Sequence, residues 1–181
     1  MRKLTCAPNV ELLGLYIDSF VNNVQGTETK PTMAKHGLAN LDPYTWYPCH
    51  KWMDALNELA QLPNVTENMV AVGMEIGKAL PVPPGVDNPT LEQMLMGLND
   101  AYQSVHRNSD VGKYTCERLN DKHLKVIFND LYPEDLTYGI VYVFAKRFLP
   151  PKTAFKVYYD EHISRRDQGG DEPTVIHVSW T

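Results

Sequence analysis

Residues 113–128 read KYTCERLNDKHLKVIF, and residues 160–180 read DEHISRRDQGGDEPTVIHVSW. The first stretch holds two short strand-like runs, 113–118 and 123–128, joined by four residues, which predicts a β-hairpin. Residues 154–159 and 175–180 alternate apolar and polar side chains and predict a second pair of strands. Between the pairs, residues 133–148 carry apolar side chains at helical spacing, acidic residues in the first turn and Lys146-Arg147 in the last. The predicted order is therefore ββαββ.

The sequence before this unit favours helices. Apolar residues recur three and four positions apart in four segments, 10–24, 48–62, 64–80 and 88–106. Residues 26–31 are rich in Gly, Thr, Lys and Pro and predict a loop. We therefore expect an α+β fold in one domain, residues 1–181, with a helical part at 1–110. The ββαββ unit at 111–181 would form a four-stranded antiparallel sheet.

Composition narrows the class of protein. A chain of 181 residues with 43% hydrophobic residues is long enough for one well-buried core. Its net charge of −5 and the lack of a Lys/Arg-rich stripe argue against nucleic-acid binding. No apolar run reaches the ~20 residues of a membrane span. The cysteines are three in number and far apart, which is typical of reduced thiols in a cytoplasmic protein.

One aromatic-rich segment, residues 44–52, invites a catalytic interpretation. It places Cys49 beside His50, and a Cys-His pair can form an activated nucleophile. Adjacent side chains diverge on a helix, however, and no third orienting group is evident. The favoured interpretation is the start of a helix whose rings pack on the core; a third is that Trp46, His50 and Trp52 line a pocket. The chain also lacks a Gly-rich dinucleotide loop. We expect a binding domain rather than an enzyme.

Four motifs in residues 90–181 resemble the superfamily of haem nitric-oxide-binding and 4-vinyl reductase domains. LNDAY at 98–102 corresponds to a Leu-Asp-x-x-His helix of haem-binding members, and KYTCE at 113–117 to the strand that follows. DLTYGIVYVFAKRF at 135–148 corresponds to a helix that ends in Arg-Phe. Residues 165–180 resemble the vinyl-reductase-type ending, with Gly-Gly-Asp and a Trp in the last strand. The resemblance implies an α+β ligand-binding fold.

The resemblance also implies two cofactors whose usual ligands are replaced here. The iron-binding imidazole of haem-binding relatives corresponds to Tyr102, which is more typical of a core aromatic; His106, one helical turn later, could substitute. Their Tyr-x-Ser-x-Arg propionate signature is not recognisable at 129–132. Haem is therefore possible but not favoured. Zinc is unlikely, because the cysteine positions of the vinyl-reductase-type site hold Arg165 and Pro173, neither of which can bind zinc.

The leading hypothesis is a non-catalytic sensor domain that holds a small hydrophobic molecule between the helical part and the sheet, in a pocket of at least a few hundred cubic ångströms. Such a domain would signal through a separate output protein or by self-association. The alternatives are a haem-based nitric oxide sensor and an enzyme or accessory protein acting on a tetrapyrrole. The candidate ligand-binding residues are Trp46, His50, Trp52, Tyr102, His106, Tyr114, Phe128 and Tyr142.

Overall fold

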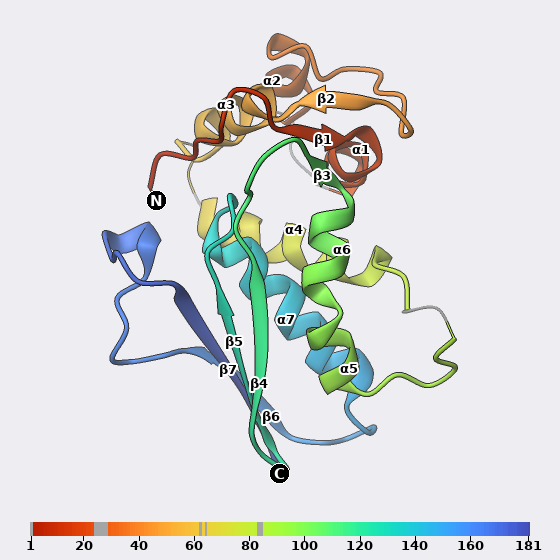
Figure 1. The fold of residues 1–181 in the computed structure, drawn as a ribbon, viewed down its shortest axis with the longest axis vertical. Helices are drawn as coiled ribbons and strands as arrows, with labels where there is room; N and C mark the ends of the chain where they lie inside the picture. The colour runs from red at the N-terminus through yellow and green to blue at the C-terminus, as the bar shows by residue number, and fades with distance from the viewer. Residues whose placement is uncertain (1, 24–28, 62, 64, 83–84) are drawn as a thin grey trace.

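The computed structural model describes residues 2–23, 29–61, 63, 65–82 and 85–181 (Figure 1). It contains two groups of elements. A twisted sheet and the helices packed beside it occupy the lower part of the view in Figure 1, and the helices of the first 60 residues, with a small second sheet, lie above them. None of the described helices has the length and apolar character needed to cross a bilayer.

The C-terminal part is the predicted ββαββ unit. Strands β4 (Tyr114–Asn120) and β5 (His123–Phe128) form a hairpin, and helix α7 (Glu134–Phe148) follows. Strands β6 (Phe155–Tyr159) and β7 (Thr174–Trp180) complete an antiparallel sheet of order β4-β5-β7-β6. The α+β prediction is confirmed. A short 3-10 turn, Arg166–Gln168, lies in the connection between β6 and β7.

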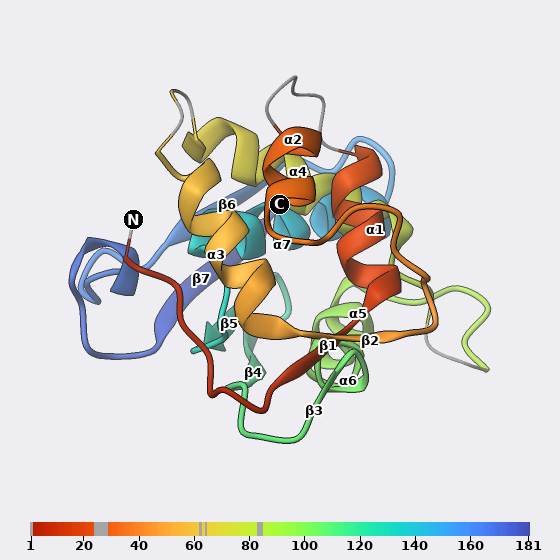
Figure 2. The ribbon, with the colours of Figure 1, turned by 90° about the horizontal axis from the view of Figure 1, so that it is seen from above.

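The N-terminal part is mostly helical, as predicted. A three-stranded sheet of order β2-β1-β3 connects the beginning of this part with its last residues, because β1 pairs antiparallel with both β2 and β3 (Figure 2). The elements are β1 (Glu11–Leu13), α1 (Gly14–Asn23), α2 (Thr29–Lys35), β2 (Trp46–Pro48), α3 (Cys49–Leu59), α4 (Val65–Ala79), α5 (Leu91–Met96), α6 (Leu98–Ser104) and β3 (His106–Arg107).

The first predicted helix, 10–24, begins too early. Its first residues form β1, and the helix starts at Gly14, whose N–H donates to the carbonyl of Thr45 at 2.8 Å. A Cβ on Gly14 would overlap the carbonyl oxygen of Asp42, so only glycine permits this close approach. Pairing with β2 and β3 therefore overrides the helical pattern of these residues. Position 24 lies outside the described residues.

Two further boundaries were predicted wrongly. The helix expected at 88–106 is two helices that meet at Gly97, and it ends at Ser104, because pairing with β1 draws His106 into a strand. Thr90 supplies a capping box for the first of them. The loop expected at 26–31 ends by Thr29, where α2 begins, while 26–28 lie outside the described residues. Pro31 is in the first turn of α2, where backbone N–H groups need no intrahelical partner.

The other two N-terminal helices lie close to their predictions. Helix α3 begins one residue after Pro48, which is in β2 and precedes the helix with φ −56°. Helix α4 matches the segment predicted at 64–80; positions 62 and 64 lie outside the described residues.

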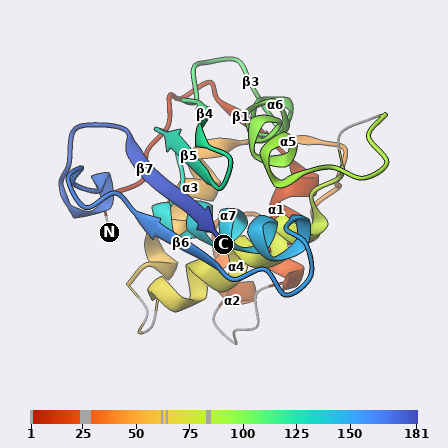
Figure 3. The ribbon, with the colours of Figure 1, turned by 90° about the horizontal axis from the view of Figure 1, so that it is seen from below.

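Helices α4 and α7 cross at a contact made by glycines. A Cβ on Gly73 would overlap the carbonyl oxygen of Leu136, and one on Gly139 would overlap the carbonyl oxygen of Val70. A Cβ on Gly77 would meet the side chain of Val143. The spacing of Gly73 and Gly77 thus serves close helix packing, and α7 lies between α4 and the sheet (Figure 3).

Candidate functional site

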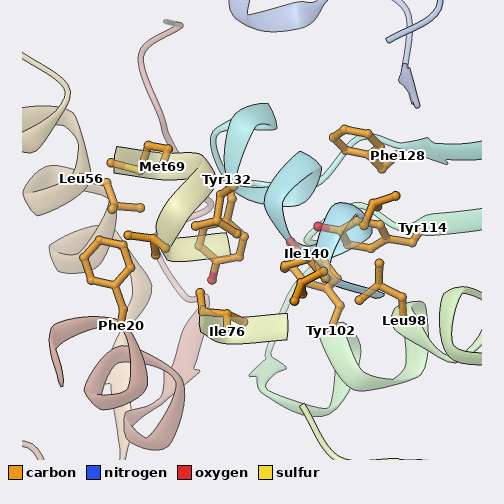
Figure 4. Packing of buried hydrophobic residues seen from close by; sticks show 14 of the residues in the cluster. Phe20, Leu56, Met69, Ile76, Leu98, Tyr102, Tyr114, Phe128, Tyr132 and Ile140 are labelled. Carbon is orange, nitrogen blue, oxygen red and sulfur yellow. The ribbon is translucent and has the colours of Figure 1, made fainter. Parts of the chain in front are cut away.

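A group of aromatic rings, most of them buried, lies where α1, α6, β3, β4 and the segment before α7 meet. We call Tyr16, Tyr102, His106, Tyr114 and Tyr132 the tyrosine–histidine cluster; Figure 4 shows three of its members. Tyr102 and Tyr114 meet edge to face with ring centroids 5.1 Å apart, and Tyr16 stacks on Tyr132 at 5.6 Å. The cluster joins the two parts of the chain, because its members come from α1, α6, β3, β4 and the segment before α7.

His106 holds the centre of the cluster through both ring nitrogens. Its Nδ1 lies 2.7 Å from the carbonyl oxygen of Tyr102, so Nδ1 carries the proton and donates. Its Nε2 therefore has no proton and accepts a hydrogen bond from the hydroxyl of Tyr132 at 2.6 Å. His106 lies in β3 and not, as predicted, on the helix of Tyr102, but the bond to Tyr102 keeps the two side by side.

The tyrosine hydroxyls have fixed partners as well. Tyr102 donates to the carbonyl of Val111 at 2.6 Å and accepts the N–H of Leu131 at 3.3 Å. Tyr114 donates to the carboxylate of Asp130, which also accepts the hydroxyl of Thr137 at 3.0 Å. Burial raises the pKa of Tyr102 and Tyr114 far above the ordinary value, and the charge of Asp130 adds to the shift. Both phenols therefore stay protonated.

Asp130 is a buried carboxyl beside the cluster. Its side chain is 0% exposed, and Arg166 Nη2 lies 3.3 Å from its Oδ1. Burial raises its pKa, while the bonds from Tyr114 and the charge of Arg166 oppose that shift. An arginine of the β6–β7 connection therefore compensates the charge.

Because His106 is buried, its protonation is expected to lower the free energy of unfolding by a measurable amount. Desolvation lowers its pKa to about 4, against the bond to Tyr102, which raises it. The pKa of a histidine in an unfolded chain is about 6.5. Between pH 4 and pH 6.5, the unfolded state therefore carries more protons than the folded state. We expect lowering the pH from about 6.5 to about 4 to reduce the free energy of unfolding by up to about 3 kcal/mol through this residue.

Urea unfolding at several pH values tests this for the wild type and for His106→Gln. The variant is expected to lose that part of the pH dependence, while His50→Gln, at an exposed position on α3, keeps the wild-type curve. Parallel curves for His106→Gln and the wild type would show that His106 is not buried as a neutral ring.

The structure places the eight candidate ligand-binding residues in several locations. Tyr102, His106 and Tyr114 come together in the cluster, and Phe128 stacks on Tyr114 with centroids 5.7 Å apart. The other four lie elsewhere. Trp46 lies under the guanidinium of Arg107, and His50 is exposed. Trp52 is buried against Phe20, and Tyr142, on α7, packs against Phe155 of β6.

Sequence reasoning missed Tyr16, Tyr132 and Asp130. Tyr16 was assigned only to a helical stripe, and Tyr132 and Asp130 were considered only as part of an absent signature. Nothing local in the sequence signals that these three side chains meet.

The space left beside the cluster is small. A cavity of about 40 Å³ lies among its rings, room for a few water-sized molecules. Its apolar wall comes from α4, α6 and α7: Ile76, Leu80, Leu98, Ala101, Val105 and Ile140. The packed tyrosines therefore leave room at Tyr102 only for molecules of about the size of water.

A larger groove lies at the opposite end of the sheet, between the start of α5, the β4–β5 hairpin and the end of α7. Its volume is about 380 Å³. Glu92 and Arg118, paired at 3.3 Å, lie at this groove. The apolar lining is Leu91, Leu124, Phe148, Leu149, Pro150 and Trp180. None of the eight predicted ligand-binding residues lines it.

The haem interpretation can be tested on these contacts. The resemblance puts the iron ligand at Tyr102, whose protonated hydroxyl is bound to Val111 and whose neighbouring cavity measures about 40 Å³. The substitute ligand, His106, has no free nitrogen. In this arrangement the residues do not fit a haem.

The position of the zinc-binding cysteine holds a salt-bridged arginine. Arg165 Nε lies 3.0 Å from Glu134 Oε2, and Arg165 Nη2 lies 2.6 Å from Asp135 Oδ1. The guanidinium also covers the ring of Tyr159 at 3.9 Å. A fixed cation of the chain itself thus joins the β6–β7 connection to the start of α7. In the turn that follows, Gly169 has φ +95°, and a Cβ added at Gly170 would overlap the carbonyl oxygen of Ser164, so both positions favour glycine.

Comparisons with known proteins agree with this fold. The sequence matches no family model and none of the curated proteins. Solved structures of H-NOX domains, the haem nitric-oxide-binding family, do match. A Cs H-NOX mutant has a TM-score of 0.71 at 12% identity over 94% of this chain and 97% of its own. The S. oneidensis H-NOX in its Fe(II)NO state has 0.68 at 12% over 94% and 99%. The K. algicida Fe(II) unliganded mutant has 0.68 at 10% over 94% and 97%. The chain therefore has the fold of H-NOX domains along nearly its whole length, which confirms the resemblance and extends it to the helical part.

Proposed function

We propose that this chain is a non-catalytic sensor domain with the H-NOX fold, which binds a small hydrophobic molecule in the groove between α5, α7 and the sheet. The observation that carries the proposal is the groove itself. Its volume of about 380 Å³ falls within the range of small-molecule sites, and aliphatic and aromatic side chains line most of it. Trp180 and Phe148 offer rigid faces, and the Glu92–Arg118 pair offers polar contacts at the opening.

The position of the groove suits a signalling role. It contacts the helical part through Leu91 and the ββαββ unit through Leu124 and Trp180, so a ligand would favour one arrangement of the two parts. A separate output protein or a second copy of the chain would receive that change.

A haem-based gas sensor is the second candidate, and the fold comparison favours it over a general small-molecule sensor. The similar solved structures include the S. oneidensis domain in its Fe(II)NO state and a structure from work on haem distortion in the H-NOX family. Against it stand the closed tyrosine–histidine cluster and the cavity of about 40 Å³. Binding of haem would require Tyr132 to release His106 and the tyrosine rings to move apart.

Native mass spectrometry of protein purified from its own host tests the first candidate. We expect a small organic molecule bound to the wild type and lost in Trp180→Ala, because Trp180 forms one wall of the groove. The matched control, Trp46→Ala, changes a tryptophan on β2 away from the groove and is expected to retain the molecule. The proposed groove is contradicted if the wild type has the mass of the chain alone and also binds no hydrophobic dye. It is contradicted as well if both variants lose the bound molecule equally.

A further inference from the structure

The outer face of the four-stranded sheet carries a chain of hydrogen-bonded histidines. His123 Nε2 on β5 lies 2.8 Å from His177 Nδ1 on β7. His177 Nε2 lies 2.9 Å from Oδ2 of Asp160, which follows β6. The register pairs Lys125 with His177, so His123 is the diagonal neighbour of His177 on the same face. Helices α4 and α7 lie on the other face of the sheet, and among the described elements no helix covers this one (Figure 3).

The hydrogen bonds fix the protons. The bond from His177 lowers the pKa of Asp160, so its carboxylate is ionised and only accepts. His177 therefore carries its proton on Nε2 and directs the lone pair of Nδ1 toward His123. In the neutral pair, His123 Nε2 is then the donor of the hydrogen bond to His177 Nδ1. One proton thus lies between two imidazole nitrogens of different strands.

We propose that His123 Nε2 and His177 Nδ1 together bind one divalent transition-metal ion of the zinc or copper type. Imidazole nitrogen is a preferred ligand of both ions. His123 binds as its other neutral tautomer, with the proton on Nδ1, so the step needs no oxidation or reduction and breaks only the bond between the rings. Asp160 acts as a positioning residue, in the carboxylate–histidine–metal arrangement that orients many ligating histidines.

The local geometry permits this change. Nitrogens bound to one tetrahedral ion at about 2.0–2.1 Å lie about 3.3 Å apart, so the rings must separate by roughly half an ångström. His177 is held by Asp160 and by Tyr158, whose ring stacks on it at 5.2 Å with an interplanar angle of 15°. His123 is more exposed and is free to give way. The Tyr158 hydroxyl, 3.5 Å from His123 Nε2, lies near the ion position.

The number of ligands limits the affinity. Among the described residues, no three His, Cys, Asp or Glu side chains are grouped to hold a metal ion, so two nitrogens are the strong ligands and water completes the shell. Lys125, the cross-strand partner of His177, lies 3.4 Å from Glu117, which reduces the repulsion between its charge and a bound ion. This site lies on the strands and is distinct from the Gly169–Gly170 turn, where vinyl-reductase-type relatives have cysteines.

Calorimetric titration of metal-stripped protein with Zn²⁺, and nitrogen hyperfine coupling in the electron paramagnetic resonance spectrum of the Cu²⁺ form, test the proposal. We expect one ion per chain and coupling to two imidazole nitrogens. His123→Ala and His177→Ala are each expected to weaken binding at least about tenfold, and Asp160→Asn about tenfold. His50→Ala, which removes an exposed histidine on α3, leaves binding unchanged.

Thermal unfolding of each variant confirms that the sheet is intact, since His123 and Asp160 are not core residues. Failure of the wild type to bind either ion overturns the proposal. The same conclusion follows if binding persists in both His123→Ala and His177→Ala, or if the copper spectrum shows no imidazole coupling.

Discussion

Replacing Gly73 by alanine is expected to lower the free energy of unfolding by about 3 kcal/mol. The added methyl group would overlap the carbonyl oxygen of Leu136 and approach the Cα of Gly139, both of which belong to the backbone of α7. Backbone atoms cannot rotate away as a side chain does, so α4 and α7 must move apart and lose buried contact. Chemical denaturation of the purified variant measures the loss.

The sign of the stability change distinguishes a glycine at a close helix crossing from a glycine in a helix without such a contact. In a helix free of such contact, alanine in place of glycine would stabilise the fold by about 1 kcal/mol. Gly85→Ala serves as the control, because an added Cβ there meets nothing within 4 Å and only the positive φ of 78° is strained. A Gly73→Ala variant that is more stable than the wild type would show that α4 and α7 do not cross at this glycine.

Replacing Arg165 by methionine is expected to cost about 3 to 5 kcal/mol, the usual result when one partner of a buried ion pair is removed. Methionine retains much of the aliphatic bulk but leaves Glu134, whose side chain is 0% exposed, with only the more distant guanidinium of Arg166, whose Nε lies 3.7 Å from Oε1. The backbone N–H of Arg166 and the hydroxyl of Thr174 still donate to Glu134, so part of its hydrogen bonding remains.

Two variants frame this measurement. Arg118→Met removes an arginine that is 50% exposed and paired with Glu92 and Asp121, so we expect a loss below about 1 kcal/mol. Adding Glu134→Gln to Arg165→Met is expected to recover part of the lost stability, because the buried charge that has lost its nearest cation is then gone. Equal losses for Arg165→Met and Arg118→Met would contradict a structural role for the Arg165 ion pairs.

The fold was predictable where local pattern and tertiary context agree. The ββαββ unit followed from two-residue alternation in the strands and from helical spacing with suitable terminal charges in α7. The errors lie where a long-range pairing overrides such a pattern: β1 recruits His106 and Arg107 across more than ninety residues and shortens two predicted helices. No local signal records that pairing.

The site was predictable only in part, for the same reason. Tyr102, His106 and Tyr114 were selected individually, and the fold brings them together with Tyr16 and Tyr132. The groove at Trp180 joins residues from α5, β4, β5, α7 and β7, which sequence spacing cannot relate. The likeness to H-NOX domains indicated a ligand-binding fold, but packing of the tyrosines determines how much space is left.

The visible absorption spectrum of protein purified from its own host, before and after addition of haem, tests whether the tyrosine–histidine cluster leaves room for a haem. If the tyrosine–histidine cluster is closed as described, we expect no Soret band before addition and no saturable band of bound haem afterwards. A stoichiometric Soret band in the wild type that is lost in His106→Ala or Tyr102→Phe would contradict the account and establish a haem-binding sensor.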